Sequence, residues 1–314
     1  MRYIDQLQDY KNENKTAITL GKFDGFHRGH QLLIDKIKEH SSAKVDSLVL
    51  AFDVGERGLL TKEEQKERMR EEVDVFISCP LSDELKKMSP EKFVEEVLVE
   101  KLNVKYLVVG SDFHFGCHRS GNVGLLEECS DKFGFHLEVT LKLTVDGKEI
   151  SSTIIKEALE EGEIHRANHL LGYNYEISGV VTEGKKLGRR LGFPTLNIVP
   201  DKSKVIPRYG VYGCKLEIEQ LEDLDDQRSV GAKANPLDRW VEYQGICNIG
   251  IKPTAVTGGE PVAEIHAFDF QGDAYGKKVK VKLLSFVRPE NKFHSVEELK
   301  GQIEKDIDVV KASL

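Results

Sequence analysis

The sequence predicts an α/β domain followed by an all-β domain that ends in a helix, and three observations lead to this prediction. Across the first half of the 314 residues, apolar strand-like runs alternate with stretches of helical spacing, a pattern typical of a parallel sheet covered by helices. After about Tyr173, short strand-like runs follow one another with turn signals such as Glu183-Gly184 between them, which is typical of a small antiparallel barrel. Ser295 to Val310 then carries apolar residues at helical spacing and predicts a closing helix.

The first half has expected strands and helices in alternation. Thr61 opens a Thr-Lys-Glu-Glu string, which predicts a helix start held by a capping box. Ser89-Pro90-Glu91 predicts another helix start, because proline is well tolerated in the first turn. We expect strands at residues 16–20, 45–52, 73–78 and 104–109, and helices at residues 28–40 and from Thr61 and Ser89 onward.

In the second half, residues 152–171 have helical spacing and predict one connecting helix. Residues 219–240 are polar and acid-rich and predict an exposed loop, after which Trp240 re-enters the core. We expect strands at residues 176–181, 210–217, 243–249, 263–270 and 278–287. The chain then divides into a first domain at residues 1–152, a connecting helix at residues 153–172 and a second domain at residues 173–314.

Composition excludes several classes of protein. With 45 Lys and Arg against 53 Asp and Glu, the formal net charge is −8, which argues against nucleic acid as the main partner. No apolar run approaches the roughly 20 residues of a membrane helix, so no membrane partner is expected. The N-terminus has no apolar signal core, and a cytoplasmic protein is expected. An odd number of cysteines without a C-x-x-C pair favours neither a disulfide framework nor a zinc site: Cys79, Cys117, Cys129, Cys214 and Cys247.

The first motif follows the first long strand and runs from Gly21 to His30. Glycines such as Gly21 and Gly25 allow a tight turn and a close approach to a ligand. His27 and His30 follow at i and i+3 on the first turn of a helix, where the helix N-terminus favours an anion such as phosphate. One histidine at such a junction is more often incidental, whereas two that bracket a glycine favour a phosphate site.

The second motif runs from Gly184 to Asn197 and is rich in glycine and basic residues, a combination that suits phosphates. Thr195 and Asn197 alternate by two, so on an extended segment both point the same way and could offer oxygen ligands to Mg²⁺. The alternative is a solvent-exposed basic hairpin. The sequence contains no G-x-x-x-x-G-K-[ST] string, so a kinase activity here would not be of the Walker type.

The N-terminal motifs resemble a known family. The stretch from His27 to His30 is similar to the H-x-G-H signature of nucleotidyltransferases, and Leu20 to Gln31 resembles the adenylyltransferase module of bacterial bifunctional riboflavin kinase/FAD synthetases. Val109 to Gly121 resembles that family's G-x-D-F-x-F-G-x-x-R-x-G string, and Ile150 to Lys156 resembles I-S-S-T-x-I-R with lysine in place of the final arginine. The family's F-x-P-H-P stretch is missing, since the chain reads Phe52-Asp53-Val54-Gly55-Glu56.

The C-terminal motifs resemble the riboflavin kinase domain of the same family. Gly192-Phe193-Pro194-Thr195-Leu196-Asn197 is similar to its Gly-Phe-Pro-Thr-x-Asn signature. Further segments follow in the family's order: Tyr209 to Gly213, Asn248 to Thr254, Ala263 to Phe270 and Phe286 to Glu290. The resemblance implies a Rossmann-like nucleotidyltransferase domain followed by a Greek-key barrel of the riboflavin kinase type.

The resemblance also implies two reactions and their residues. Riboflavin and ATP would give FMN in the second domain, and FMN and ATP would give FAD and pyrophosphate in the first, with Mg²⁺ as cofactor. Glu264 would be the general base of the kinase, whereas His27 and His30 would act on the transferred group of the adenylyltransferase. The implied phosphate ligands of the first domain are Gly21, Phe23, Asp24, Gly25, Ser151, Ser152, Thr153 and Lys156. The implied FMN cleft has Asp112, Phe113 and Arg119, and the implied flavin ligands of the kinase are Arg288 and Glu290. The implied kinase ATP ligands are Gly184, Lys185, Gly188, Arg189, Gly192, Pro194 and Asn248, with Thr195 and Asn197 for the metal.

Three alternatives stay open at this point. The adenylyltransferase domain could be weak or inactive, because Lys156 replaces arginine and the Pro-His-Pro stretch is absent. The chain could be a flavin-binding sensor without catalysis, although binding alone needs neither a base nor metal ligands. It could also be another nucleotidyltransferase with an unrelated barrel, which the C-terminal motifs oppose. The sequence does not decide the oligomeric state.

Overall fold

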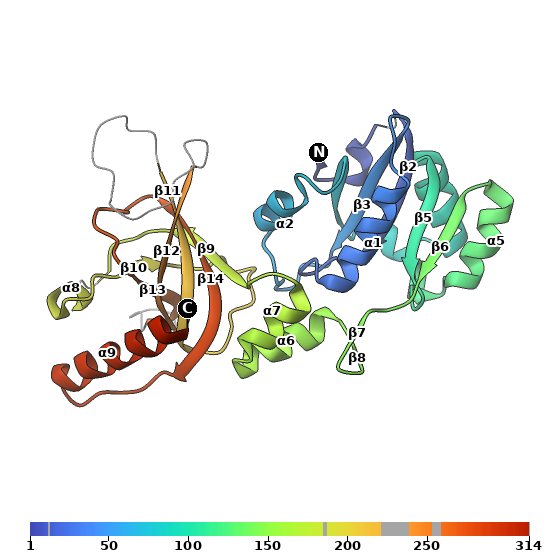
Figure 1. Ribbon diagram of the computed structural model, residues 1–314. Coiled ribbons are helices and arrows are strands. Elements are labelled where there is room, and N and C mark those ends of the chain that lie inside the picture. Colours follow the sequence, from blue (N-terminus) through green and yellow to red (C-terminus); the bar gives the residue numbers. More distant parts are fainter. Residues whose placement is uncertain (12, 185–186, 221–238, 253–258, 314) are drawn as a thin grey trace. The chain divides into compact units, whose positions relative to one another are not determined.

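The computed structural model describes residues 1–11, 13–184, 187–220, 239–252 and 259–313 (Figure 1). The chain forms two compact units, Met1–Ser152 and Thr153–Leu314, each described here by itself. Among the described residues, no helix is long and apolar enough to cross a membrane.

The first unit is a parallel sheet with the strand order β1-β4-β3-β2-β5-β6. Its strands are β1 (Arg2–Ile4), β2 (Lys15–Gly21), β3 (Val45–Asp53), β4 (Val75–Pro80), β5 (Val104–Gly110) and β6 (His136–Thr140). The prediction of a parallel sheet is confirmed, and the four expected strands are β2 to β5. The edge strands β1 and β6 were not predicted, because β1 has three residues and β6 is mostly polar.

The helices of the first unit begin where the sequence predicts them. Thr61 and Glu64 form the expected capping box, and Ser89 accepts a hydrogen bond from the backbone N–H of Lys92 with Pro90 in the first turn. The helices are α1 (Arg28–Glu39), α2 (Lys62–Met69), α3 (Asp83–Lys87), α4 (Pro90–Lys92), the π-helical η2 (Phe93–Lys101) and α5 (Val123–Phe133). A short hairpin of β7 (Thr144–Val145) and β8 (Lys148–Glu149) follows β6.

The order of strands in this sheet positions a ligand site. From β2 the chain continues to β3 and β4 on one side, and then crosses to β5 and β6 on the other. In open parallel sheets ligands bind at the carboxyl ends of the strands where the order reverses. Here that place lies after Gly21 of β2 and Gly110 of β5, where two of the sequence motifs begin.

The second unit begins with two helices rather than the one predicted connecting helix. α6 (Ser152–Glu161) and α7 (Ile164–Leu171) are separated at Gly162, whose φ is +81°. A left-handed residue ends an α-helix, and glycine adopts this conformation at little cost. The prediction of a single helix was wrong. The apolar spacing of residues 152–171 continues across Gly162, so the pattern gives no sign of the break.

Six antiparallel strands follow in the order β10-β13-β12-β11-β14-β9. They are β9 (Glu176–Val180), β10 (Leu196–Ile198), β11 (Gly210–Glu219), β12 (Trp240–Lys252), β13 (Glu260–Ala267) and β14 (Lys278–Pro289). A bridge between Thr182 and Asn197 links the segment after β9 to β10 and nearly closes the barrel. The predicted small barrel is therefore confirmed.

Two details of the barrel differ from the prediction. The strand expected to reach Phe270 ends at Ala267, because Asp269 lies in a turn with φ +58°. Trp240 is half-buried rather than part of the core, and Nζ of Lys280 lies 4.4 Å from the centre of its ring. Most of the predicted acidic loop, residues 221–238, lies outside the described residues.

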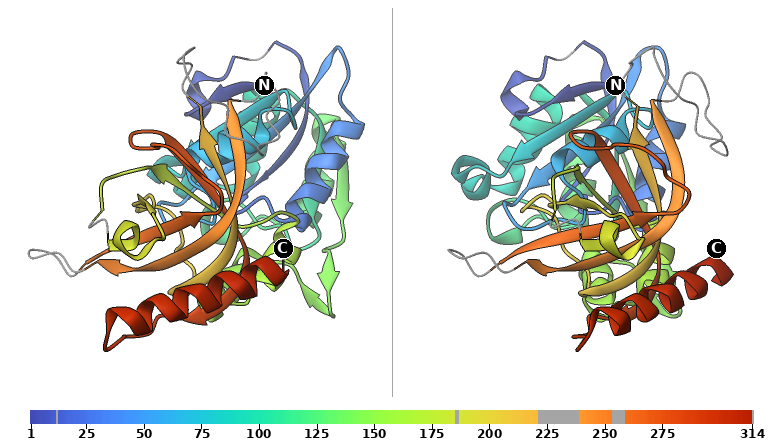
Figure 2. Two further views of the ribbon diagram at one scale, coloured as in Figure 1. Left: turned by 60° about the vertical axis from the view of Figure 1, so that its left-hand side comes forward. Right: turned by 90° about the vertical axis from the view of Figure 1, so that its left-hand side faces the viewer.

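A final helix, α9 (Val296–Ser313), packs on the barrel as predicted (Figures 1 and 2). Its partly buried Ile303 and Ile307 and its buried Val310 contact Val211 of β11 and Ile246 of β12. The short helix α8 (Leu187–Leu191) lies in the glycine-rich motif before β10.

Candidate active sites

The glycine loop after β2 has a constrained backbone. Gly25 has φ +86°, and Phe23 and Phe26 have φ values of +46° and +41°, in the left-handed region that phenylalanine rarely adopts. Both phenylalanine rings are almost fully buried, with centroids 5.7 Å apart. Burial of the rings holds the loop in this conformation, and such strain is common at ligand sites.

The two histidines of the motif form one stacked unit at the start of α1. Their ring centroids are 3.7 Å apart and their planes differ by 15°. The backbone N–H of His30 donates to Nδ1 of His27 over 3.3 Å, so His27 caps the helix through a ring nitrogen. Because Nδ1 of His27 accepts, a neutral ring carries its proton on Nε2, which can donate to a ligand.

A side chain at Gly29, between the histidines, would crowd the ring of His27. A Cβ at this position would lie 3.2 Å from Cε1 and Nδ1 of His27. The glycine of H-x-G-H therefore allows the ring of His27 to lie over the first turn of α1.

Burial keeps both histidines neutral. It lowers the pKa of His27 from 6.5 to about 4, although the nearby Asp24 carboxylate acts in the opposite direction. Burial also holds the pKa of His30 well below its usual value, and His27 contributes to that shift. Nδ1 of His30 is buried and has no hydrogen-bond partner among the described residues. The site thus offers neutral imidazoles to an anion at a helix N-terminus.

Asp24 connects this loop to two other segments. Its carbonyl accepts a hydrogen bond from Oγ of Ser152 over 2.8 Å, and its Oδ1 accepts one from the backbone N–H of Leu59 over 2.6 Å. The structure therefore brings Ser152 of the Ile150–Lys156 motif to the glycine loop. Thr153 and Lys156 lie on α6 and belong to the second unit.

The loop after β5 carries the residues of the expected FMN cleft. Asp112 forms an ion pair with Lys142, whose Nζ lies 2.7 Å from Oδ2 of Asp112 and 2.6 Å from Oε2 of Glu149. These two carboxylates raise the pKa of Lys142. Lys142 was not predicted as a site residue, since a single lysine in a polar segment gives no signal in the sequence.

The remaining residues of this motif have packing roles as well. The rings of Phe113 and Phe115 are stacked with centroids 5.6 Å apart. A Cβ at Gly116 or Gly121 would lie 2.7–2.8 Å from atoms of Pro90, so these glycines let the loop dock on the start of α4. Arg119 is exposed and has φ +57°.

The segment that lacks Pro-His-Pro has an ion pair in its place. Oδ2 of Asp53, at the end of β3, lies 2.9 Å from Nζ of Lys62, and Oδ1 accepts a hydrogen bond from the backbone N–H of Gly55 over 2.8 Å. Lys62 and this N–H hold the pKa of Asp53 below its usual value. This end of β3 therefore carries a paired carboxylate and lysine instead of a histidine.

In the barrel, one row of residues crosses five strands. Glu264 of β13 lies directly opposite Asn197 of β10 on one side and opposite Asn248 of β12 on the other. Val211 of β11 lies opposite Asn248 and also opposite Arg288 of β14. Because directly opposite residues share one face of a sheet, the row brings the expected base and the residues expected to bind the metal, ATP and the flavin to the same face.

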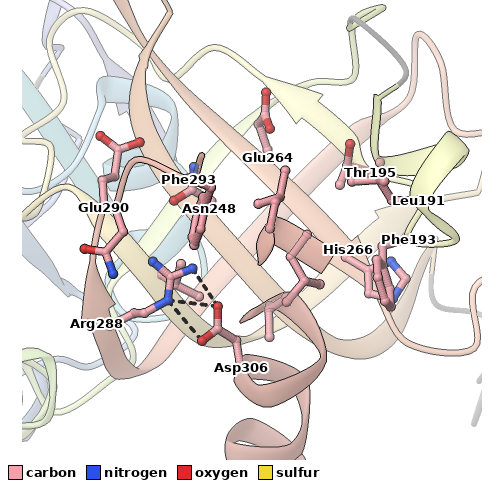
Figure 3. A pocket seen from close by; sticks show the side chains of 16 residues that line it. Leu191, Phe193, Thr195, Asn248, Glu264, His266, Arg288, Glu290, Phe293 and Asp306 are labelled. Carbon is pink, nitrogen blue, oxygen red and sulfur yellow. Dashed lines mark hydrogen bonds and ion pairs between the residues drawn. The ribbon is translucent and has the colours of Figure 1, made fainter. Parts of the chain in front are cut away.

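This row borders a pocket of about 280 Å³ between the barrel and α9 (Figure 3). Asn248, Glu264, Arg288 and Glu290 line it, together with Thr195. Apolar side chains from β11, β12 and α9 complete the wall: Val211, Ile246, Leu299 and Ile303. A pocket with one apolar wall and several convergent polar groups is typical of a small-molecule site.

The glycines of the second motif let its backbone pack closely on Thr195 and Asn197, the expected metal ligands. A Cβ at Gly184 would lie 2.5 Å from Nδ2 of Asn197, and one at Gly188 would lie 3.2 Å from Cγ2 of Thr195 and overlap the carbonyl of Phe193. Gly192 has φ +92°, which favours glycine. A threonine hydroxyl and an asparagine amide oxygen are hard oxygen donors of the kind that Mg²⁺ prefers, so Thr195 and Asn197 fit the expected metal.

Among the described residues, the other predicted residues of this motif do not line the pocket. The carbonyl of Pro194 lies 2.9 Å from Nδ1 of His266, which links the motif to β13. Arg189 is exposed on α8. Lys185 lies outside the described residues. Glu290 lies close to the backbone of β12, since a Cβ at Gly250 would overlap its carboxylate.

Arg288 is not free in the pocket, which the sequence did not predict. Its Nε lies 3.0 Å from both oxygens of Asp306 on α9, and Nη2 lies 2.7 Å from Oδ2. Asp306 is only 2 % exposed. An aspartate within an apolar helix pattern gives no indication of such a partner.

The two candidate sites indicate a chain with two nucleotide-dependent activities. One site is an anion site of the nucleotidyltransferase type, and the other is a barrel pocket of the kinase type. Comparison with known proteins agrees for both units. The family described as FAD synthetase matches residues 9–154, and the family described as riboflavin kinase matches residues 171–314. The unrelated barrel considered as an alternative is thereby excluded.

Relatives match along nearly the whole chain. The bifunctional riboflavin kinase/FMN adenylyltransferase of Haemophilus influenzae is 35% identical over 94% of this chain and 93% of its own length. The protein of the same description from Bacillus subtilis is 33% identical over 94% of this chain and 92% of its own. The chain belongs to the family of bifunctional riboflavin kinase/FMN adenylyltransferases.

A solved structure has the same fold. A crystal structure described as a macrolide-efflux protein from Streptococcus pneumoniae is similar with a TM-score of 0.83 and 25% identity, covering 99% of this chain and 98% of that one.

Proposed function

We propose that the second unit phosphorylates riboflavin with ATP to give FMN, that the first unit adenylylates FMN with a second ATP to give FAD, and that Glu264, His27 and His30 act on the reacting groups. The observation that carries this proposal is the row in which Asn197 and Asn248 lie opposite Glu264, with Glu264 and Asn248 lining the pocket. With the proposed roles, the base would lie between a metal ligand and an ATP ligand.

In the kinase reaction, Glu264 accepts the proton of the flavin 5′-hydroxyl while the hydroxyl oxygen attacks the γ-phosphorus of ATP. The new O–P bond forms as the bond to the ADP oxygen breaks, and ADP leaves. Thr195 and Asn197 would hold Mg²⁺, which would neutralise charge on the phosphates. Asn248 and the glycine motif orient ATP, and Arg288 and Glu290 bind the flavin.

In the adenylyltransferase reaction, a phosphate oxygen of FMN attacks the α-phosphorus of ATP, and pyrophosphate leaves as its bond to that phosphorus breaks. Nε2–H of His27 donates to the phosphate, and His30 stacks behind it on the same helix turn. Donors fixed at a helix N-terminus stabilise the charge that develops on the transferred group. The loop of Asp112 and Phe113 forms the FMN side of the cleft. Both reactions take place in the cytoplasm, where ATP is available.

The sensor alternative needs only a flavin pocket. The pocket of the second unit also contains Glu264 and Thr195, which flavin binding does not require. The alternative of a weak or inactive first unit rests on Lys156 and the absent Pro-His-Pro stretch, but the stacked histidine pair is present and His27 caps the helix. These observations favour two active units.

Product analysis tests the proposal. The purified chain is incubated with riboflavin, ATP and Mg²⁺, and the flavins are separated by chromatography over time. We expect FMN first and FAD afterwards, and FAD alone when FMN is supplied directly. Accumulation of FMN without FAD would refute the role of the first unit, and binding of riboflavin without turnover would support the sensor.

A further inference from the structure

Asp306 on α9 is a buried carboxylate whose hydrogen-bonding capacity is fully used. Its oxygens accept bonds from Nε and Nη2 of Arg288, and Oδ1 also accepts one from Nε2 of Gln302 over 2.8 Å. The side chain of Asp306 is 3% exposed. A buried charge is tolerated only when it is paired in this way, so Asp306 acts on its partner and has no capacity left for a ligand.

Arg288 keeps part of its donor capacity. Besides its bonds to Asp306, Nη1 donates to the carbonyl of Pro289 over 3.0 Å. A guanidinium has five N–H groups, which leaves one on Nη1 and one on Nη2 without a partner among the described residues. The guanidinium carbon lies 5.7 Å from the centre of the Phe293 ring, and both side chains line the pocket (Figure 3).

The row across the barrel indicates which end of the substrate meets Arg288. Three strand spacings of about 4.8 Å lie between Glu264 and Arg288 along the curved sheet, so their backbones are at most ~14 Å apart. An extended five-carbon side chain with part of a tricyclic ring covers a similar length. With the 5′-hydroxyl at Glu264, the ring of riboflavin therefore reaches Arg288, where the ring edge carries carbonyl and nitrogen acceptors.

We propose that Asp306 is a positioning residue for flavin binding, because it fixes the guanidinium of Arg288 so that the two remaining N–H groups meet the acceptor edge of the flavin ring. This inference rests on the proposed kinase function. It adds that α9 determines riboflavin affinity through a charge pair, and that ATP binding and the chemical step do not depend on that pair.

The test uses the full chain and three substitutions. Asp306→Asn keeps the shape but removes the charge and turns an NH₂ group toward Arg288, Asp306→Glu keeps the charge, and Asp308→Asn is a matched control at an exposed position of α9. Kinase kcat and the KM values of riboflavin and ATP are measured for each variant. Riboflavin Kd without ATP is measured by flavin fluorescence, and the rate of FMN adenylylation in the same sample reports on the first unit.

We expect Asp306→Asn to raise riboflavin KM and Kd about 10- to 100-fold, with kcat and ATP KM within about twofold of the original chain. Asp306→Glu should recover part of the affinity, and Asp308→Asn should change nothing. In the Arg288→Lys background, Asp306→Asn should add little further loss, because Asp306 acts through Arg288.

Two results would overturn the inference. One is a fall in kcat together with a rise in both KM values in Asp306→Asn, which a loosened α9 would cause. The other is an equal loss from Asp306→Asn with and without Arg288. If Asp306→Asn does not fold, the same comparison is made with Asp306→Glu, whose riboflavin KM must rise while its ATP KM does not. Both results can be distinguished from a failure of the proposed function, because in that case the unsubstituted chain would not phosphorylate riboflavin.

Discussion

The imidazole rings of His27 and His30 lie face to face, with 3.7 Å between their centroids. Two imidazolium ions at this distance would repel each other, and burial further disfavours their charged forms. The helix N-terminus and neutral N–H donors therefore provide the anion site, without fixed positive charge from the histidines. Such a site needs no change of protonation to bind phosphate at neutral pH.

The lowered histidine pKa values predict a loss of stability in mild acid. Between about pH 6.5 and pH 4 the unfolded chain binds a proton at His27 that the folded chain does not bind, so the free energy of unfolding falls as the pH falls. The loss is about 1 kcal/mol per pH unit for each such histidine. His27→Gln removes one titrating group, so its melting temperature should fall less across this range.

The control for this prediction is His136→Gln, at an exposed position of β6 in the same unit. Melting curves are recorded at intervals from pH 7 to pH 4. Equal slopes of melting temperature against pH for His27→Gln and the original chain would contradict the neutral-histidine assignment.

Gly29→Ala should reduce FAD formation without destabilising the chain. The new Cβ would lie 3.2 Å from the ring of His27 and displace it, whereas alanine in a helix is more favourable than glycine by up to about 1 kcal/mol. We expect FMN adenylylation to fall by more than about tenfold. Riboflavin phosphorylation should not change.

Gly301→Ala is the matched control, since a Cβ at that position of α9 meets nothing within 4 Å. Adenylylation rates, phosphorylation rates and melting temperatures are compared for both variants. An unchanged adenylylation rate in Gly29→Ala would show that the position of His27 does not limit the reaction.

Much of the fold could be predicted from local patterns. The strands β2 to β5 and the capping box at Thr61 are encoded within a few residues, and the structure has them where the sequence predicts them. The break at Gly162 could not be predicted, since one glycine inside a helical pattern is also tolerated without a break. The edge strands β1 and β6 form because neighbouring strands pair with them, which their own residues do not indicate.

The sequence also predicts candidate site residues on its motifs, but not how these residues lie relative to one another. Strand register places Glu264 opposite both Asn197 and Asn248, and register depends on pairing between segments distant in sequence. Asp306 and Lys142 were missed for the same reason, because each acquires its role from a partner on another element.

Glu264→Gln and His30→Ala should separate the two reactions. Glutamine keeps the size of Glu264 but accepts no proton, so riboflavin phosphorylation should fall by about 10²- to 10⁴-fold while FMN adenylylation continues. His30→Ala should have the opposite effect. Both rates are measured on the same samples, and an equal loss of both activities in either variant would argue against separate sites.

Lys156→Arg should raise FAD formation. Arginine presents a planar fork that binds phosphate oxygens in pairs, whereas lysine offers a single charged point. We expect a modest gain in kcat/KM for FMN adenylylation, with riboflavin phosphorylation as the internal control. Lys156→Gln, which removes the charge, should lower it. An unchanged rate in both variants would show that this position does not contact the reacting phosphates.

The proposed metal role of Thr195 predicts a difference between two small substitutions. Thr195→Ser keeps the hydroxyl and loses the methyl group. This methyl carbon lies near Gly188, since a Cβ at Gly188 would be 3.2 Å from it. Thr195→Val keeps the methyl group and loses the hydroxyl, so only the valine variant lacks an oxygen ligand. Phosphorylation of riboflavin is measured over a range of Mg²⁺ concentrations at saturating ATP. The valine variant should need about tenfold or more Mg²⁺ for half-maximal rate, because the remaining donors hold the ion less tightly. The serine variant should stay close to the original chain. If the serine variant is the more impaired of the two, Thr195 acts by packing against the glycine motif, and the Mg²⁺ ligands must be assigned elsewhere.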